Sequence, residues 1–347
     1  MAPVTRTTGN EGEEARNLMN RLVSGAAATH MVFAAATLGI ADLLQDGARS
    51  ADEMAPLCGV HPHALYRLLR ALTTLGVFVE NRQGTFSLNT AADLLRSDVK
   101  GSMRWWAMLE GQDWYAAVWS HILYSIGTNE SAFDDKHGTS FFEFCAGNPR
   151  ASDIFNRVMT SFSNEEALGL VAALDFSSAR RIIDIGGGHG RLLSAILATN
   201  TTLRGVLFDL PSVIAGARTD MDGAVTARCE FIAGDFFDSI PSGADCYIMK
   251  SVLHDWNDER ALTILRNARN AIPDVGRLLI VERDVPEDGE PSIAKLFDIS
   301  MLLWSGGMER TTRQYRALLD QSGFELQRVL HTSTPLSIYE ATPRAHG

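Results

Sequence analysis

Residues 180–198 read RRIIDIGGGHGRLLSAILA, which is a short apolar strand, a glycine-rich turn and an amphipathic helix in direct succession. Four further apolar segments follow and have the character of buried strands: RGVLFDL, CEFIAGDFF, DCYIMKSVL and GRLLIVERD. Helical segments, PSVIAGAR and DERALTILRNARNAI, stand between them. Short buried strands that alternate with helices predict a parallel α/β sheet, which binds its ligands at the carboxyl ends of the strands.

Two segments near the C-terminus depart from the sheet of a simple dehydrogenase. ELQRVLHT and LSIYEAT lie on either side of a short Ser-Thr-Pro turn and are expected to form an antiparallel pair. A chain of 347 residues has room for about two domains with ample core. The sheet-forming part is therefore expected to share the chain with a second domain.

Residues 16–95 have a different organisation, with short helices followed by a hairpin. Ser50 and Glu53 have the spacing of a capping box, and VFVENRQGTFSLN alternates around a turn at residues 82–84. The helix between them carries an apolar stripe made of Leu65, Leu68, Leu69, Leu72 and Leu75. Helix, helix and hairpin predict a winged-helix arrangement.

A winged helix is typical of DNA-binding regulators, but the charge of this chain argues against that function. The net charge is -11 and the pI about 5.3, and residues 1–100 contain slightly more acidic than basic residues. A DNA-binding protein needs several basic contacts to phosphate, so dimerisation is the favoured role. The sequence also bears on location. The apolar runs are too short to span a membrane, and the polar N-terminus does not resemble a signal peptide. We therefore expect a cytoplasmic protein.

The glycine turn does not have the fingerprint of dinucleotide-binding proteins. That fingerprint is G-x-G-x-x-G, but its third glycine position holds Arg191 when counted from Gly186 and Leu193 when counted from Gly188. Asp184 stands two residues before the first glycine. A carboxylate there would repel a pyrophosphate, and it suits a ligand that carries an amino group.

Carboxylates also end the next two strands. Asp209 is placed to accept hydrogen bonds from both hydroxyls of a ribose, and Asp235 with Phe236 is placed for the edge and face of an adenine. Three acids at three successive strand ends predict a nucleoside-containing ligand. The same residue types also serve as helix caps and turn formers, which is the structural alternative.

Five short motifs occur in order behind the winged-helix region: DIGGGHG, FDLP, GDFF, LHDWND and GGMERT. Together they resemble the S-adenosylmethionine-dependent O-methyltransferases. The branch is the one with plant caffeate-type enzymes and bacterial enzymes that methylate aromatic polyketides, phenazines and related antibiotic skeletons. The resemblance spans residues 16–342.

This resemblance implies a domain plan. Residues 175–347 would form a Rossmann-like catalytic domain with a seven-stranded sheet and an antiparallel last strand. Residues 1–100 would form an all-helical, winged-helix-like domain that makes a homodimer, and residues 101–174 would connect the two and line the acceptor pocket.

The resemblance also implies S-adenosylmethionine as the cofactor and no metal. The glycines would hold the methionine part, Asp209 the ribose, and Asp235 with Phe236 the adenine. The full set of residues expected at the cofactor is Asp184, Gly186, Gly188, Gly190, Asp209, Leu210, Asp235, Phe236, Lys250, Ser251 and Ser163. Two positions depart from the family pattern: Met308 stands where the plant enzymes have lysine, and His189 occupies a loop position that usually holds a smaller residue.

The stretch KSVLHDWND, residues 250–258, places a histidine at the end of an expected buried strand. His254 is either a packed ring or a base, and in the family the histidine of LHDW takes the proton from the acceptor hydroxyl. Free phenol has a pKa near 10 and histidine a pKa near 6.5, so complete deprotonation before attack would cost about 5 kcal/mol. Proton transfer is therefore expected to be concerted with attack.

Such a base needs an acidic group to orient it. Glu282 ends the apolar segment RLLIVE, a poor place for an unpaired charge, and Glu309 lies in GGMERT. In the family the corresponding acids flank the histidine, so both are predicted as its partners. Asp255 is a further catalytic candidate, but Asp255 and Asp258 precede a helix and are equally expected to be caps.

Aromatic and methionine side chains predict a flat apolar slot for the acceptor. They lie in segments that line the acceptor pocket in relatives, and they are Phe155, Met159, Phe162, Met301, Trp304 and Trp105, with Trp106 as a further candidate. Stripes with this spacing are also typical of plain core. Because few basic residues stand nearby, a neutral polycyclic or substituted phenol is expected.

Three classes of function compete. An O-methyltransferase is the favoured one. A nicotinamide oxidoreductase conflicts with Arg191 and Leu193, and a ligand-sensing DNA regulator conflicts with the acidic charge. Some relatives use the bound cofactor for hydroxylation or decarboxylation, but His254 favours methyl transfer. The sequence does not distinguish a hydroxyl from a nitrogen as the methylated group, and it does not identify the acceptor.

Overall fold

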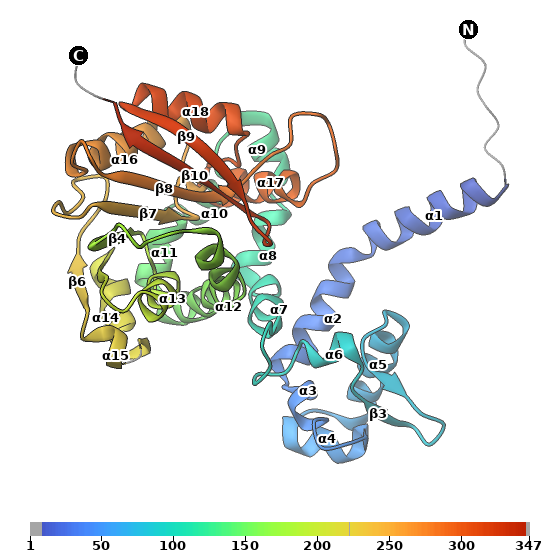
Figure 1. The fold of residues 1–347 in the computed structure, drawn as a ribbon. Helices are drawn as coiled ribbons and strands as arrows, with labels where there is room; N and C mark the ends of the chain where they lie inside the picture. Colours follow the sequence, from blue (N-terminus) through green and yellow to red (C-terminus); the bar gives the residue numbers. More distant parts are fainter. Residues whose placement is uncertain (1–8, 222, 345–347) are drawn as a thin grey trace, which may run out of the picture. The chain divides into compact units, whose positions relative to one another are not determined.

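The computed structural model describes residues 9–221 and 223–344. They form two compact units with a boundary between Ala116 and Ala117, each with an apolar core of its own (Figure 1). The boundary falls inside the helical segment 101–174 that was expected between the two domains. Within the described ranges, no helix combines the length and the apolar character needed to cross a membrane.

The N-terminal unit consists of short helices and a small sheet. Its helices are α1 (Gly9–Val23), α2 (Gly25–Thr37), α3 (Ile40–Leu43), α4 (Ala51–Cys58), α5 (Pro62–Thr74), α6 (Thr90–Asp93) and α7 (Arg104–Glu110). Its three antiparallel strands have the order β1 (Arg49–Ser50), β3 (Thr85–Ser87), β2 (Val79–Glu80). Helices α4 and α5 followed by the β2–β3 hairpin make the predicted winged-helix arrangement, although the short strands mean that the unit is not all helical.

Local sequence signals determine where these helices begin and end. Ser50 accepts a hydrogen bond from the backbone of Glu53, whose carboxylate accepts one from the backbone of Ser50, so the predicted capping box is confirmed. Three residues of the predicted stripe are buried in the core, namely Leu65, Leu69 and Leu72. Leu75 is 47% exposed, contrary to the expectation, because α5 ends at Thr74 and Leu75 is only its C-cap.

The second unit is built around a seven-stranded sheet. Its strand order is β6 (Cys229–Ala233), β5 (Arg204–Asp209), β4 (Arg181–Ile185), β7 (Cys246–Lys250), β8 (Arg277–Arg283), β10 (Leu336–Pro343), β9 (Phe324–His331). Strands β6 to β8 in this order are parallel, and β10 is antiparallel to both of its neighbours. The predicted sheet with a reversed last strand, and the predicted closing hairpin, are confirmed.

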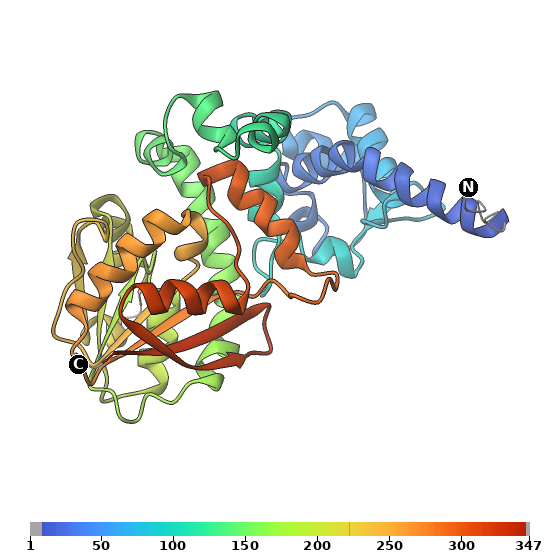
Figure 2. The same cartoon turned by 90° about the horizontal axis from the view of Figure 1, so that it is seen from above.

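Helices cover both faces of this sheet (Figures 1 and 2). One face packs against α16 (Asp258–Ala271) and α18 (Thr312–Gln321). The other face packs against α12 (Pro149–Ala173), α13 (Arg191–Thr199), α14 (Pro211–Asp220) and α15 (Gly223–Thr226). The remaining elements are α8 (Asp113–Trp119), which spans the unit boundary, α9 (Ile122–Thr128), α10 (Ala132–His137), α11 (Phe141–Gly147), α17 (Ile293–Ser305) and the 3-10 turn η1 (Leu253–Asp255).

The chain reverses its direction across the sheet between β4 and β7. Strands β4, β5 and β6 proceed to one side, and β7 then returns to the other side of β4. In open α/β sheets, ligands bind in the crevice outside the carboxyl ends of the strands at such a switch point. The glycine turn follows β4 and η1 follows β7, so both predicted site segments lie at this place in the fold.

Candidate active site

The glycine turn leaves β4 with a backbone that favours glycine. The angle φ is +66° at Gly186, +58° at Gly188 and +71° at Gly190, all in the left-handed region. A Cβ on Gly187 would lie 2.6 Å from the carboxylate of Asp184. The turn is therefore a largely bare backbone cradle at the N-terminus of α13, and a Cβ on Gly186, Gly187 or Gly190 would lie within 3 Å of a neighbouring side chain.

Asp209 joins the end of β5 to this cradle. Its Oδ2 accepts a hydrogen bond from the backbone N–H of Gly188 at 2.8 Å, and its Oδ1 accepts one from the N–H of Leu210 at 2.7 Å. Burial raises the pKa of Asp209, while these two N–H groups lower it. The residue predicted to bind a ribose thus lies directly beside the turn predicted to bind the rest of the ligand.

Asp184 is a buried acid beneath the cradle. It is 1% exposed, and its Oδ2 has no hydrogen-bond partner among the described residues. Burial and the charge of Asp209 raise its pKa to about 7, and the charge of Lys250 opposes them. A buried carboxylate without a full set of partners is costly, and it suits a ligand with positive charge such as the ammonium and sulfonium groups of S-adenosylmethionine.

Lys250 connects the end of β7 to α12. Its Nζ lies 2.8 Å from Oε2 of Glu166 and 3.2 Å from Oγ of Ser163. The next residue, Ser251, has a positive φ of 54°, which is unusual for a residue with a side chain. The structure brings the predicted trio of Lys250, Ser251 and Ser163 together, and it adds Glu166, which sequence reasoning did not single out.

The two residues predicted to bind the adenine, Asp235 and Phe236, follow the end of β6. Asp235 Oδ1 accepts a hydrogen bond from the N–H of Phe237 at 2.8 Å. The ring of Phe236 packs 5.0 Å from that of Phe237 and 6.2 Å from that of Trp256, measured between centroids. A Cβ on Gly186 would lie 3.5 Å from the ring of Phe236. Phe236 is therefore close to the glycine turn, as a residue that contacts the same ligand must be.

His254 lies in η1, and its ring is held by buried carboxylates. Its Nδ1 is 3.0 Å from Oε1 of Glu309 and 3.5 Å from Oε2 of Glu282. Its Nε2 is 3.7 Å from Oδ1 of Asp255, beyond hydrogen-bond distance. The structure thus brings all four predicted catalytic residues together. The shorter contact makes Glu309 the hydrogen-bond partner of Nδ1, which leaves Nε2 for another group.

Glu282 makes its main contacts with the backbone rather than with the ring. Its Oε1 accepts hydrogen bonds from the N–H groups of Val252, Leu253 and His254, at 2.9, 2.8 and 3.4 Å. The carboxylate thereby caps the start of η1, where free N–H groups collect. From the sequence, the end of an apolar strand was a poor place for the charge of Glu282. These three donors explain why the charge can be buried there.

The acids around His254 change its proton affinity. Burial alone would lower the pKa of His254, but the charges of Glu282, Glu309 and Asp255 outweigh it and raise the pKa to about 10. The pKa of Asp255 is raised to about 7, by burial first, with His254 opposing. His254 and Asp255 therefore hold their protons more tightly than an isolated histidine and aspartate would, as expected for charged groups that share a buried site.

The same three side chains have the geometry of a possible cation site. Ligand atoms of His254, Glu282 and Glu309 all lie within 4.8 Å of one another. A metal ion would need the lone pair of Nδ1, whereas the 3.0 Å contact with Glu309 has the length of an N–H to carboxylate hydrogen bond. A protonated Nδ1 that donates to Glu309 therefore explains how these three side chains are arranged. That the enzyme needs no metal stays a prediction, which chelation can test.

The expectation that Asp255 or Asp258 caps the helix after LHDWND is wrong. Asn257 is the N-cap of α16, and its Oδ1 accepts a hydrogen bond from the N–H of Arg260 at 3.0 Å. Asp258 is the first residue of the helix, and it pairs with Arg310 at 2.8 Å. Arg310 is 0% exposed and was not among the predicted residues.

The predicted acceptor-pocket residues are distributed over both units. Phe155 on α12 packs against Phe141 with centroids 4.9 Å apart, and Trp304 on α17 packs against Trp119 at 5.1 Å. Met159, Phe162 and Met301 lie on the same two helices, with Met159 36% exposed. Trp105 lies on α7 in the N-terminal unit, so its place in the pocket stays a prediction.

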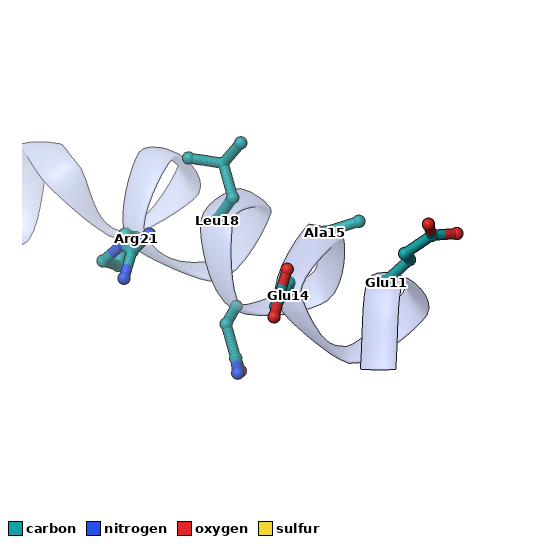
Figure 3. A pocket seen from close by; sticks show the side chains of 6 residues that line it. Glu11, Glu14, Ala15, Leu18 and Arg21 are labelled. Carbon is teal, nitrogen blue, oxygen red and sulfur yellow. The ribbon is translucent and has the colours of Figure 1, made fainter. Parts of the chain in front are cut away.

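A surface hollow on α1 is unrelated to these residues. It is lined by Glu11, Glu14, Ala15, Asn17, Leu18 and Arg21, which all come from this one helix (Figure 3). None of the predicted catalytic, cofactor or acceptor residues lines it.

A reversed strand in an otherwise parallel sheet, with acids rather than phosphate-binding groups around the glycine turn, is the architecture of an α/β methyltransferase. Comparison with protein families makes this specific. Residues 119–325 match the model of the O-methyltransferase domain, and residues 20–98 match that of the O-methyltransferase dimerisation domain. The chain belongs to the S-adenosylmethionine-dependent O-methyltransferases.

Individual relatives cover nearly the whole chain. A phenazine O-methyltransferase of Lysobacter antibioticus is 41% identical over 94% of this chain and 96% of its own, and a mitomycin biosynthesis 6-O-methyltransferase of Streptomyces lavendulae is 38% identical over 94% and 95%. A solved O-methyltransferase from neocarzinostatin biosynthesis has a TM-score of 0.79 at 32% identity, covering 91% of this chain and 96% of its own. It was crystallised with S-adenosylmethionine and 2-hydroxy-5-methyl naphthoic acid.

Proposed function

We propose that this enzyme transfers the methyl group of S-adenosylmethionine to a hydroxyl of an aromatic small molecule, a polycyclic phenol that is an intermediate of natural-product biosynthesis. The contact of 3.0 Å between Nδ1 of His254 and Oε1 of Glu309 carries the proposal. It orients the ring in a buried site at the switch point of the sheet and directs Nε2 to the acceptor. His254 is then the general base.

The reaction requires that the acceptor hydroxyl is aligned with the methyl group and that its proton is removed during attack. When bound, S-adenosylmethionine supplies a methyl group on a positively charged sulfur. The acceptor oxygen must stand in line with the methyl carbon and the sulfur, so positioning provides much of the rate enhancement. Nε2 of His254 would accept the hydroxyl proton as the oxygen–carbon bond forms and the carbon–sulfur bond breaks, so that S-adenosylhomocysteine would leave with the sulfur electron pair. The carboxylates of Glu309 and Glu282 would stabilise the imidazolium that results.

The raised pKa of His254 suits this task. Its pKa of about 10 is close to that of free phenol, about 10. The cost of about 5 kcal/mol expected for proton transfer to an unperturbed histidine is therefore largely replaced by the cost of removing the proton that the ring already holds. The accompanying cost is that the ring must lose its own proton before it can act, which makes the reaction faster at alkaline pH.

The cofactor roles follow from the contacts around the cradle. Asp184 would face the positive charge of the methionine part, Asp209 the ribose, and Asp235 with Phe236 the adenine. The aromatic residues of α12 and α17 would hold the acceptor ring. The names of the relatives, which act on phenazine, mitomycin and naphthoate compounds, support a fused-ring acceptor.

The active species is proposed to be a homodimer formed through the N-terminal unit. The match to the dimerisation domain supports this, and so does α1, on which Leu18, Met19, Leu22 and Val23 are 48, 56, 63 and 78% exposed. Removal of residues 1–23 should reduce the mass measured by light scattering towards that of one chain. A cytoplasmic location, with no nucleic-acid partner, remains a prediction from sequence.

The decisive test is a methyl-transfer assay over a panel of phenols and aromatic amines, with labelled S-adenosylmethionine and product identification by mass spectrometry. A general base contributes roughly 100- to 10,000-fold, so His254→Ala should reduce kcat by about that factor. His331→Ala, at an exposed position on β9, serves as the matched control. Full activity of His254→Ala on a phenol, or transfer to amines alone, would refute the proposed role of His254.

A further inference from the structure

The turn that carries His254 is held at both of its ends by buried charged side chains. Glu282 accepts hydrogen bonds from three N–H groups at the start of η1. At the other end, Nη1 of Arg310 donates to the carbonyl of Leu253 at 2.9 Å, and Nη2 donates to the carbonyl of Trp256 at 2.7 Å. The acid therefore faces the donors of the turn and the guanidinium faces its acceptors, which is the electrostatically favourable order.

Besides the two carbonyls of the turn, Arg310 binds the carboxylate of Asp258 and, through Nη1 at 3.3 Å, the carbonyl of Met308. It is 0% exposed, and its Nε donates to Oδ1 of Asp258 at 2.9 Å. The carbonyls of Leu253 and Trp256 that it binds lie one residue before and two residues after His254. A planar guanidinium can hold several acceptors at fixed angles, whereas the ammonium of lysine is a point charge on a flexible stem.

The backbone around Arg310 fits against the same turn. The N–H of Met308 donates to the carbonyl of His254 at 2.9 Å. Gly307 packs so closely that a Cβ there would lie 2.2 Å from the same carbonyl oxygen. The carbonyl of Arg310 accepts a hydrogen bond from Val285, just beyond β8, at 3.1 Å. Residues 307–310 are thus tied to the sheet on one side and to the histidine turn on the other.

We propose that Arg310, with Gly307 behind the turn, is the positioning residue of the base: it fixes the backbone of η1 so that His254 keeps Nδ1 on Glu309 and directs Nε2 to the acceptor. Glu309 and Arg310 are neighbours in sequence, and they divide the task, since one holds the ring and the other holds its backbone. The inference rests on the proposed role of His254 as the base.

The experiment compares Arg310→Lys and Arg310→Ala with Arg313→Lys, whose parent side chain is 77% exposed on α18. Displacement of a reacting group by about 1 Å can cost on the order of 100-fold in rate. We expect Arg310→Lys to lower kcat by about that factor, with little change in the dissociation constant of S-adenosylmethionine measured by calorimetry. The acid limb of the pH–rate profile should also move, because the ring no longer keeps its distance to Glu309.

Free guanidinium at millimolar concentration should restore part of the activity of Arg310→Ala but not that of His254→Ala. If the Arg310 variants do not fold, as judged by circular dichroism, Gly307→Ala displaces the same turn from behind and should give the same split between kcat and cofactor binding. An unchanged kcat and pH profile in Arg310→Lys, or in Gly307→Ala where it replaces that test, would overturn the inference. Activity that survives His254→Ala would instead overturn the proposed function.

Discussion

Replacement of Glu309 by glutamine should move the pH dependence of methyl transfer in a defined direction. The change keeps the shape of the side chain and removes the charge that lies 3.0 Å from Nδ1 of His254. A hydrogen bond to a charged group contributes about 1.5–3 kcal/mol, and one pKa unit corresponds to about 1.36 kcal/mol. Loss of the charge should therefore lower the pKa of His254 by roughly one to two units, from its raised value of about 10.

The assay is kcat/KM measured against pH with one phenolic acceptor, so that ionisation of the acceptor is the same for every variant. Activity rises with pH because the base must be neutral, and Glu309→Gln should shift this acid limb to lower pH. The plateau at high pH should fall, since a weaker base removes the proton less effectively. Glu282→Gln should move the limb in the same direction, because its charge also raises the pKa of His254.

A suitable control is Glu340→Gln on β10, where the carboxylate pairs with Arg277 and Arg328 instead of a histidine. This variant should leave the acid limb in place. An acid limb that does not move in Glu309→Gln, or that moves to higher pH, would refute the assignment of Glu309 as one of the groups that raise the pKa of His254.

Further predictions concern the cradle and the stability of the site. Asp184→Asn should stabilise the ligand-free protein at pH 8 by roughly 1–3 kcal/mol in urea unfolding, because it removes a buried charge that lacks a full set of partners, and it should weaken S-adenosylmethionine binding in calorimetry. Gly187→Ala should abolish that binding while the fold is retained by circular dichroism, since its Cβ would lie 2.5 Å from Leu207. Dialysis against EDTA should leave methyl transfer unchanged, and a loss that zinc or magnesium restores would contradict metal independence. Because the pKa of His254 is higher in the folded protein than in the unfolded chain, where it is near 6.5, protonation of His254 stabilises the fold fully below pH 6.5. This stabilisation is lost as the pH rises through about 10. His254→Gln should therefore lower the free energy of unfolding more at pH 6 than at pH 10.5.

Sequence patterns predicted the elements whose signals are local. The strand and helix alternation, the glycine turn and the capping box at Ser50 depend on residues within a few positions of one another, and the structure has them. The cap of α16 was predicted wrongly because Asp255, Asn257 and Asp258 are all competent caps by type. Their backbone conformations decide between them, and only Asn257 has the extended conformation of an N-cap with its side chain bound to the first turn.

Local sequence patterns do not predict contacts between residues that are far apart in the chain, and such contacts were predicted only where a family motif indicated them. Glu309 was predicted from the motif that it shares with relatives. Arg310 stands next to it, but nothing in the sequence separates this fully buried residue from Arg313, which is largely exposed. The role of Arg310 depends on carbonyl groups more than fifty residues earlier in the chain, and backbone carbonyls leave no trace in a sequence.

The position of β10 has a consequence for how the protein is made. This strand follows β9 in the chain but lies between β8 and β9 in the sheet, and Ser337 on it pairs with Glu282. In the described sheet β9 contacts β10 and not β8, so β9 has no edge to join until β10 has been synthesised. We expect the two strands to add as a preformed hairpin, a late and non-local step of the kind that slows folding. During translation, the edge of β8 beside the future base would stay open to mispairing with other chains until that hairpin arrives.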